Sequence, residues 1–431
     1  MKKNILIIAS NFPPNKRAGG VIRIVKLIKY LPITIWNPIV ITTKSKYQNN
    51  NDRLYNEISN KCEIYRLPQC DIRIVYQRLK YLYAKFNLFK IFKKKKKAKI
   101  SKESKIPISS NFLIPDHLIL WAFLSFIKSF FICVLKKIDL IYVTSPSQSG
   151  LLVGLCLKKT IKIPLIVDYR DPWTTNPFHI KRVFSFLNKI ENKLEFSVLN
   201  NADKIIVINV FFIESIIKKF PTIDQNKFEV VPNGFDKDDF KDIKPIVTKK
   251  HNIVHAGNFY LGRSPVPFLK AFANLIKNNL EFFNNWELTL VGSGNEFKKD
   301  IENLGISNYV NIIGHVSHQE AIGYMLGSKT LLLVPGIGKT TLTGKIFEYI
   351  GARKPIFVMG NESAASKLVE DLRIGTTCPE DNLDLLSKSL SAFLKNLDSY
   401  NYRDNIEHKI NNYDRKVIAE TTSNIMIKMF K

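Results

Sequence analysis

Cysteine, arginine and acidic residues are all scarce in this chain of 431 residues. The five cysteines are an odd number, spread without any pair or His/Cys cluster of metal-ligand spacing, which argues against a disulfide framework and a structural zinc site. The 19 glycines and 19 prolines are too few for a collagen-like or low-complexity chain. Because hydrophobic residues make up 45% of the sequence, we expect two globular domains rather than a disordered chain.

The shortage of acidic residues leaves a net charge of +28, from 65 Lys and Arg against 37 Asp and Glu. Only 13 of these 65 cations are Arg, and the abundance of Lys, Asn and Ile is typical of an AT-rich genome. Nucleic-acid binders favour Arg for its bidentate contacts with bases and interleave it with aromatic residues. This pattern is absent, so nucleic acid is not an expected partner.

The positive charge is concentrated in one segment, from Leu79 to Lys105, which contains eleven Lys and one acidic residue around the run 93–97. Just before that run, Leu82, Phe86 and Phe89 have the spacing of an apolar stripe on a helix. Such a helix can lie on an anionic membrane surface, which is then an expected partner. A solvated loop is the alternative.

Two apolar segments bear on where in the cell the protein is located. The segment from His117 to Leu135 is long enough to suggest a membrane span, but Lys128 near its middle favours a buried or half-inserted helix. The run from Asn4 to Ser10 is too short for a signal peptide and predicts a buried strand. We therefore expect a cytoplasmic protein, peripheral on the inner face of the cell membrane.

Strand-like apolar runs alternate with helical patterns along most of the chain, which predicts an α/β fold with two doubly wound parallel sheets. The expected strands are 4–10, 38–42, 63–67, 140–145, 164–168, 204–208 and 228–231, and then 253–256, 287–291, 310–313, 330–334 and 355–359. The expected helices of the first series are 21–31, 148–159, 181–200 and 211–219.

The polar stretch 236–251 separates the two series and predicts the link between two domains. The first domain is expected at 1–240, with the Lys-rich insert near 75–110, and the second at 250–405. Residues 406–431 predict a C-terminal helix that packs back on the first domain.

Ligands of such sheets bind where the strands end, so residues just after each strand are the candidates for a site. In the first domain, Gly19 and Gly20 open a helix whose N–H groups could hold an anion, unless they form a mere turn. Asp168, Arg170 and Asp171 follow the fifth strand, where packing does not call for charges. A structural ion pair is the alternative interpretation of these three residues.

The second domain has residues of the phosphate-binding type at several strand ends. Gly257 and Arg263 follow the first strand, Gly292 follows the second, and Gly314 and His315 end the third. Backbone N–H groups of glycine-rich turns and fixed cations are suited to phosphate oxygens. These strand ends therefore predict an anionic ligand.

A last candidate helix opens at Gly344, after the fourth strand of this domain. On it, Lys345 and Glu348 lie one turn apart and on one face. Read without context, they would form only a solvated ion pair at the surface.

Five motifs, taken in order, resemble bacterial glycosyltransferases of the family 4-like group: NFPPNKRAGGVIR, VDYRDPW, VPNGFD, HAGNFYLGR and TGKIFEYIGARKPI. The resemblance covers nearly the whole chain apart from the Lys-rich insert. It implies the GT-B fold, in which two Rossmann-like domains face a central cleft. It also implies transfer of a sugar from a nucleotide diphosphate sugar to an acceptor, for capsule, O-antigen or exopolysaccharide synthesis.

By this resemblance, the second domain holds the donor and the first holds the acceptor. Glu348 matches the carboxylate that accepts both ribose hydroxyls, and Arg263 and Lys345 would lie on the pyrophosphate. Fixed cations and the helix N-terminus at Gly344 would stabilise the departing diphosphate, so neither a metal ion nor another cofactor is expected.

The resemblance also implies that Gly19 and Gly20 approach the donor phosphates from the first domain, and that residues 314–316 line the base. The expected acceptor is a lipid-linked saccharide, and the expected stereochemistry is retaining. Thr340 stands where many members have a Glu that contacts the donor sugar, so the sugar is left open. An epimerase or phosphorylase with the same fold, and a non-catalytic membrane scaffold, are the alternatives.

Overall fold

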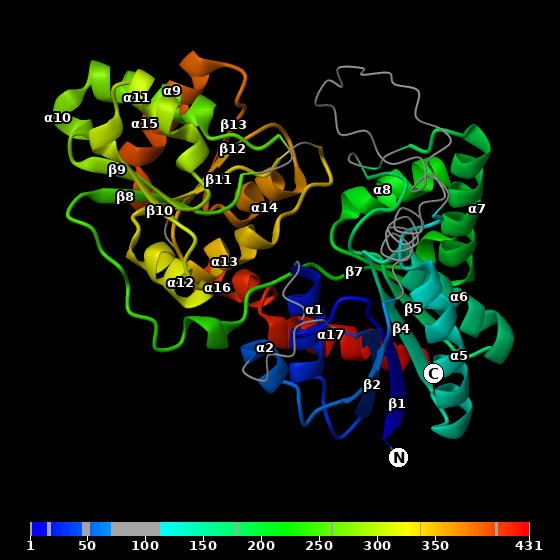
Figure 1. Cartoon of the computed structure of the whole chain (residues 1–431). Coiled ribbons are helices and arrows are strands. Elements are labelled where there is room, and N and C mark those ends of the chain that lie inside the picture. Colours follow the sequence, from blue (N-terminus) through cyan, green and yellow to red (C-terminus); the bar gives the residue numbers. More distant parts are fainter. Residues whose placement is uncertain are drawn as a thin grey trace, which may run out of the picture. The chain divides into compact units, whose positions relative to one another are not determined.

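The computed structural model describes residues 2–14, 19–44, 52–69, 113–176, 179, 181–259, 262–336, 338–400 and 404–430. The chain divides into two compact units, and each is described here by itself (Figure 1). Unit 1 comprises Met1–Val207, Ile213–Val230 and Thr422–Lys431, and unit 2 comprises Ile208–Phe212 and Val231–Thr421. The expected Lys-rich insert near 75–110, with its run 93–97, lies outside the described residues.

Unit 1 is built on a seven-stranded sheet in the order β3-β2-β1-β4-β5-β6-β7, with every strand pair parallel. The strands are β1 (Lys3–Ile8), β2 (Trp36–Thr43), β3 (Glu63–Leu67), β4 (Leu140–Thr144), β5 (Leu165–Asp168), β6 (Lys204–Val207) and β7 (Phe228–Val230). The central strands are apolar along their length because helices cover both faces of a parallel sheet. The strands β2 and β3 extend the sheet on one side of β1, and β4 to β7 extend it on the other, so the strand order reverses between β1 and β4.

The helices up to β7 are α1 (Gly19–Tyr30), α2 (Arg53–Asn56), α5 (Ile119–Leu135), α6 (Gln148–Ile161), α7 (Ser185–Asn201) and α8 (Val210–Lys219). In unit 1, α5, α6 and α7 pack side by side, with α6 in the middle (Figure 1). The helix expected from residue 181 begins at Ser185 instead, because Arg182 is engaged by Asn188 and by Glu191.

Unit 2 is built on a six-stranded parallel sheet in the order β10-β9-β8-β11-β12-β13. The strands are β8 (His251–Gly257), β9 (Trp286–Gly292), β10 (Val310–Gly314), β11 (Thr330–Leu333), β12 (Ile356–Met359) and β13 (Gly375–Cys378). Five of the six were expected, and β13 was not, because its sequence GTTC has no apolar run.

Apolar layers cover both faces of this second sheet. Phe268 and Phe393 belong to the core on one face, and Phe347 and Val369 belong to the core on the other. The helices of unit 2 are α9 (Val266–Asn278), α10 (Leu280–Phe283), α11 (Lys298–Asn303), α12 (His318–Gly327), α13 (Gly344–Ala352), α14 (Ala364–Leu372), α15 (Leu383–Lys395) and α16 (Asp404–Asn411). Two doubly wound α/β units are therefore confirmed.

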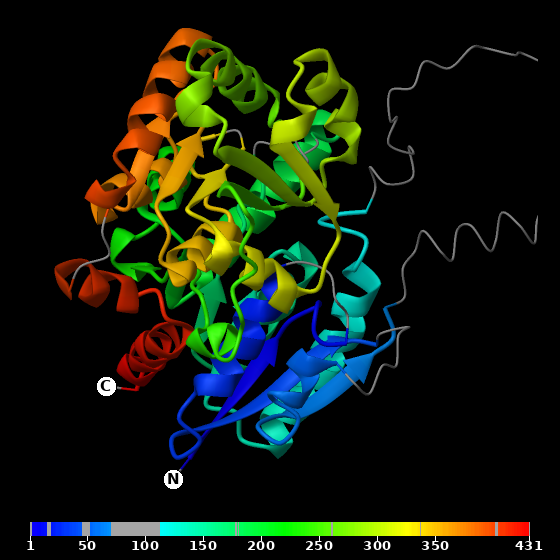
Figure 2. The ribbon, with the colours of Figure 1, turned by 90° about the vertical axis from the view of Figure 1, so that its left-hand side faces the viewer.

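The last helix, α17 (Arg415–Lys428), begins in unit 2 and ends in unit 1. Near the end of the chain, the indole N–H of Trp36 donates to the hydroxyl of Ser423 at 2.7 Å, and the ring of Phe430 lies 6.2 Å from that of Trp36. The ammonium of Lys3 lies over the same Phe430 ring. Figure 2 shows this red end of the chain near the blue strands at the N-terminus.

The apolar segment expected at 117–135 forms α5, and one side of that helix is buried in unit 1. Trp121, Ser125 and Ile132 are among the buried residues, whereas Lys128 is exposed. Among the helices that the structure describes, none combines the length and the hydropathy that crossing a bilayer requires.

Candidate functional site

The first group of candidate residues lies at the carboxyl edge of the unit 2 sheet, where β8 and β11 are neighbours. Strand order reverses between these two strands, and ligands of doubly wound sheets bind at such a point. Gly257 ends β8 with a φ of 145°, and a Cβ atom there would overlap the Cε and Nζ atoms of Lys345. Only a glycine lets the lysine approach the strand end this closely.

The docking of α13 brings Lys345 to this edge. The hydroxyl of Tyr349 accepts the N–H of Ala256 at 2.8 Å and donates to the carbonyl of Leu332 at 3.2 Å, so it fastens the helix to both β8 and β11. One turn earlier, the ammonium of Lys345 donates to the carbonyl of Asn258 at 3.3 Å.

Arg263 and Gly292 complete the cluster around Lys345. A Cβ atom at Gly336, just after β11, would lie 2.8 Å from Nε of Arg263, and one at Gly292 would lie 2.6 Å from the carbonyl oxygen of Gly257. At the ends of the neighbouring strands β9, β8 and β11, glycine backbone thus packs closely against the two cations or against the next strand end. The structure therefore brings together Gly257, Gly292, Arg263 and Lys345, which lie apart in the sequence.

The two cations change the electrostatics of this edge. Burial, together with the charge of Arg263, lowers the pKa of Lys345 to about 8, although Glu348 partly opposes the shift. Burial and then the charge of Lys345 lower the pKa of His255 to about 3, against the opposing effect of its hydrogen bond with the carbonyl of Leu332. Its ring stacks on Phe259, with centroids 4.2 Å apart. A positive potential concentrated in this way attracts an anion.

Glu348 lies one turn beyond Lys345, and its Oε1 atom is 3.0 Å from Nε2 of His318, the first residue of α12. His318 could not be identified from the sequence, because it is 30 residues from Glu348 and no spacing rule connects the two. Gly314, with a φ of 81°, and the exposed His315 come shortly before His318 in the chain. Gly314 pairs with Val291, the neighbour of Gly292, where β10 and β9 end.

In unit 1, Gly20 and Arg170 come together at the corresponding reversal of strand order, between β1 and β4. A Cβ atom at Gly20 would overlap the guanidinium of Arg170, whose Nε donates to the carbonyl of Ser145 at 2.8 Å. Its Nη2 lies 2.8 Å from Asp171, a carboxylate that is half exposed. Gly19 is the first residue of α1, as expected.

Asp168 has a different environment from its two neighbours. Its carboxylate is completely buried and accepts hydrogen bonds from Nε and Nη2 of Arg23 at 3.1 and 3.0 Å and from the hydroxyl of Thr144 at 2.9 Å. These contacts correspond to the structural ion pair that was the alternative interpretation for this segment. Arg23 was not singled out from the sequence, because 145 residues separate it from Asp168.

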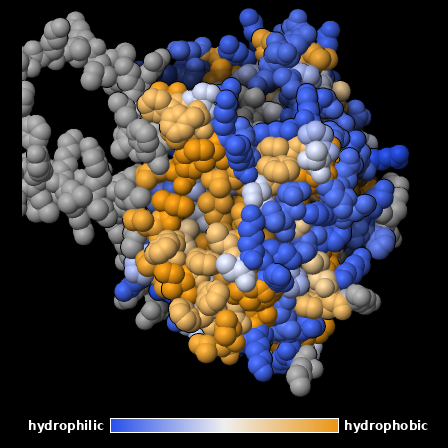
Figure 3. Space-filling model, turned by 90° about the vertical axis from the view of Figure 1, so that its right-hand side faces the viewer, coloured by the Kyte–Doolittle hydropathy of each residue, from blue (hydrophilic) through white to orange (hydrophobic). Residues whose placement is uncertain are grey.

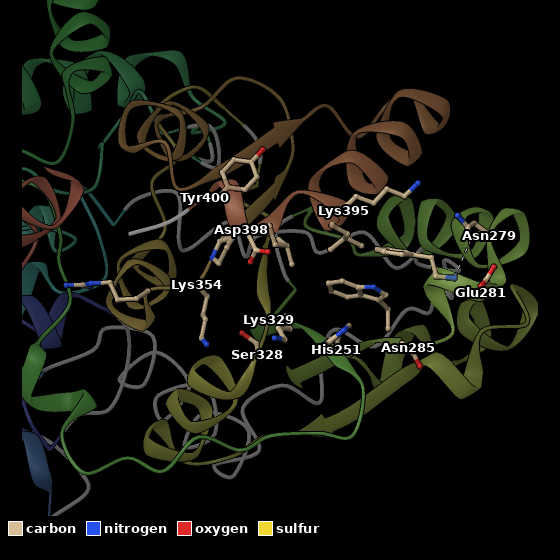
Figure 4. Close-up of a pocket in the computed structure, with 16 residues that line it drawn as sticks. His251, Asn279, Glu281, Asn285, Ser328, Lys329, Lys354, Lys395, Asp398 and Tyr400 are labelled. Atoms are coloured by element: carbon tan, nitrogen blue, oxygen red, sulfur yellow. Dashed lines mark hydrogen bonds between the residues drawn. The ribbon is translucent and has the colours of Figure 1, made fainter. Parts of the chain in front are cut away.

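A pocket of about 870 Å³ opens at the opposite, amino edge of the unit 2 sheet (Figure 4). His251 and Trp286 lie at the starts of two strands on one side of it, and Lys329, Lys354 and Tyr400 belong to the rest of its wall. None of the residues expected to bind the donor lines this pocket. Among the described residues, no group of three or more His, Cys, Asp or Glu is arranged to hold a metal ion.

Two family models match the chain side by side. Residues 91–239 match Glycosyltransferase Family 4, and residues 236–416 match Glycosyl transferases group 1. A search of curated proteins gave no significant match.

Several solved structures have the same fold as this chain. Sucrose-phosphate synthase from Thermosynechococcus elongatus matches with a TM-score of 0.67 at 13% identity, over 100% of this chain and 99% of its own. Anabaena Alr3699/HepE in complex with UDP matches with a TM-score of 0.65 at 14% identity, over 99% and 100%. WaaG, a glycosyltransferase involved in lipopolysaccharide biosynthesis, matches with a TM-score of 0.61 at 13% identity, over 98% and 99%.

These similarities cover both units, and they agree with the two parallel sheets. The chain is a glycosyltransferase with the GT-B fold that uses a nucleotide sugar.

Proposed function

We propose that unit 2 holds the diphosphate of the donor at the strand ends around Gly257, and that the enzyme transfers the sugar to a lipid-linked saccharide in cell-envelope polysaccharide synthesis. The observation that carries the donor site is the pair of cations, Lys345 and Arg263, placed against backbone that has no side chain in the way. A diphosphate is a ligand whose charge and oxygens two neighbouring cations can bind.

The departing nucleoside diphosphate gains negative charge as the glycosidic bond breaks. Lys345, Arg263 and the N–H groups at the start of α13, from Gly344, would stabilise that charge in the transition state. Their positions are set by the sheet before the donor binds, so little reorganisation is needed. In this proposal sugar transfer requires no metal ion. The retaining stereochemistry is what the family resemblance implies.

Glu348 is assigned to the ribose of the donor, with His318 as the partner that orients its carboxylate. One carboxylate oxygen faces His318, and the second oxygen can accept a ribose hydroxyl. Gly314 and His315 precede His318 and are assigned to the base. UDP is the nucleotide named for the HepE structure, so a uridine nucleotide is the first donor to test here.

On the acceptor side we assign Arg170 and Asp171, and the role of Gly19 and Gly20 toward the donor phosphates stays a prediction of the family resemblance. Asp168 is assigned to holding the end of β5 through Arg23, because no part of its carboxylate reaches solvent. A lipid-linked acceptor requires that the enzyme come to a membrane. The Lys-rich insert near 75–110 and the apolar helix α5 support a peripheral attachment to its inner face.

The experiment that tests this function measures nucleoside diphosphate release from a panel of nucleotide sugars, with and without a lipid-linked saccharide acceptor. Release that requires the acceptor and equals the sugar incorporated into lipid supports a transferase of this class. Conversion of the nucleotide sugar without any transfer would point to an epimerase, and sugar transfer only to water-soluble acceptors would contradict the lipid-linked acceptor.

A further inference from the structure

Large apolar side chains gather on the outer surface of unit 1, on the side of the molecule that Figure 3 shows. Helix α5 contributes one row of them, spaced so that they share the face opposite its buried side. Phe123 is 62% exposed and Leu135 is 78% exposed. The exposed residues of this row are Leu120, Phe123, Ile127, Phe131, Val134 and Leu135.

A second group lies in the segment that leads into α7 and in the first turns of that helix. It consists of Val183, Phe184, Phe186 and Ile190, and Val183 is 74% exposed. This segment is tied to the start of α5, because Nη2 of Arg182 donates to the carbonyl of Pro115 at 2.7 Å. The two groups together are called the apolar face. Figure 3 shows apolar side chains running as one band over this side of unit 1.

Neither α5 nor α7 exposes an acidic side chain, and Glu63 of β3, which is exposed beside the end of α5, is paired with Lys136 at 2.6 Å. Helix α5 contains no acidic residue, and the two on α7, Glu191 and Glu195, are buried. Glu191 pairs with Arg182 at 2.9 Å, and Glu195 pairs with Lys219 at 3.0 Å.

The exposed charges on α5, on α7 and just before α7 are all positive, and they are Lys128, Lys181, Lys189 and Lys193. An apolar surface with a cationic rim is complementary to a bilayer that contains anionic lipids. The hydrocarbon region accepts the apolar side chains, and the negative headgroups attract the lysines.

We infer that the apolar face is a membrane-docking surface, which inserts the side chains of α5 and of the segment 183–190 into the interface of an anionic bilayer. The inference rests on the proposed function, since a lipid-linked acceptor is what brings this enzyme to a membrane. A helix of 17 residues with one side buried in the protein lies along the interface and does not cross the bilayer.

Two other occupants fit the charges less well. In a symmetric dimer through this face, the same patch meets itself, so the lysines of the two copies would lie near one another. The segment between Leu79 and Lys105 carries eleven Lys and one acidic residue, so it too would bring cations against the cationic rim. An anionic bilayer is the occupant that satisfies both the apolar side chains and the lysines.

The test is sedimentation of the full chain with vesicles of phosphatidylglycerol and phosphatidylethanolamine, without donor or acceptor. The variant Phe123→Ser/Phe186→Ser removes one ring from each group of the apolar face. We expect its partition onto the vesicles to fall roughly tenfold or more, since two large apolar side chains no longer enter the interface. The matched control, Ile33→Ser/Leu280→Ser, changes two equally exposed apolar residues elsewhere and should bind as the parent does.

Binding of UDP, GDP and ADP, measured in parallel by thermal shift, separates this inference from the proposed function. Loss of vesicle binding with unchanged nucleotide stabilisation supports the membrane surface even if no lipid-linked acceptor is ever found. If the Phe123→Ser/Phe186→Ser variant binds vesicles as the parent does, the inference is overturned. If that variant instead only converts a dimer to a monomer in sedimentation velocity, the face is an interface between two copies, and the inference is likewise overturned.

Discussion

Titration of Lys345 gives the sharpest prediction for the proposed diphosphate site. Burial and the neighbouring Arg263 lower the pKa of this ammonium to about 8 in the ligand-free protein. A bound diphosphate favours the charged form, so above pH 8 binding must be accompanied by the uptake of a proton. We therefore expect nucleoside diphosphate affinity to fall as the pH rises from 7 to 9.

The size of this effect follows from the fraction of Lys345 that is charged. With a pKa of about 8, that fraction drops from roughly nine-tenths at pH 7 to one-tenth at pH 9, so the dissociation constant should rise about tenfold. The terminal phosphate does not contribute, because its second pKa is near 6. The assay is calorimetric titration of UDP, GDP and ADP at pH 7, 8 and 9, in buffers of different ionisation enthalpy. The protein should take up nearly one proton per ligand at pH 9.

The control variants are Lys345→Arg and Lys345→Gln. The guanidinium stays charged over the whole range, so Lys345→Arg should bind with little pH dependence, whereas Lys345→Gln should bind weakly at every pH. If the parent protein shows no change between pH 7 and 9, or if Lys345→Arg keeps the full change, then Lys345 does not contact the diphosphate.

Three further predictions concern the other candidate residues. Glu348→Gln should lose about 1.5 to 3 kcal/mol of nucleoside diphosphate affinity in calorimetry, through lost charge-assisted hydrogen bonds, and an unchanged affinity would rule out its ribose role. Arg170→Ala should lower the rate of sugar transfer far more than it lowers nucleotide affinity, because Arg170 follows β5 in the expected acceptor domain; equal losses in both would contradict an acceptor role. Asp168→Ala should lower the free energy of unfolding in urea by about 3 to 5 kcal/mol, because it removes the buried carboxylate that compensates the charge of Arg23, and a normal stability with lost activity would restore a catalytic assignment.

Most strands of both sheets could be predicted from the sequence, because strands covered on both faces are continuous apolar runs. The runs at Ile5–Ile8 and Leu331–Leu333, for example, are completely buried. The strand β13 was missed, since its sequence GTTC is short and half polar and its place is set by pairing with β12. The start of α7 was misplaced by four residues because side-chain hydrogen bonds of Arg182 with Glu191 and with the carbonyl of Pro115, which apolar periodicity does not show, hold the chain before Ser185.

The candidate site could be predicted only in part. The glycines and cations could be predicted as site residues because they follow predicted strands. The proximity of Lys345 to Gly257 could not, because it depends on how Tyr349 fastens α13 to the sheet. The partners of two acidic residues, His318 for Glu348 and Arg23 for Asp168, were missed for a related reason. Pairings across 30 or 145 residues are fixed by tertiary packing, which has no local signature in the sequence.

A crystal structure of the protein with the nucleoside diphosphate that stabilises it most would test the proposed donor site most directly. We predict that the diphosphate lies at the carboxyl edge of the unit 2 sheet, with oxygens within hydrogen-bond distance of Lys345 and Arg263 and a ribose hydroxyl on Glu348. A nucleotide found instead in the pocket between Trp286 and Tyr400, at the amino edge of the same sheet, would contradict this site.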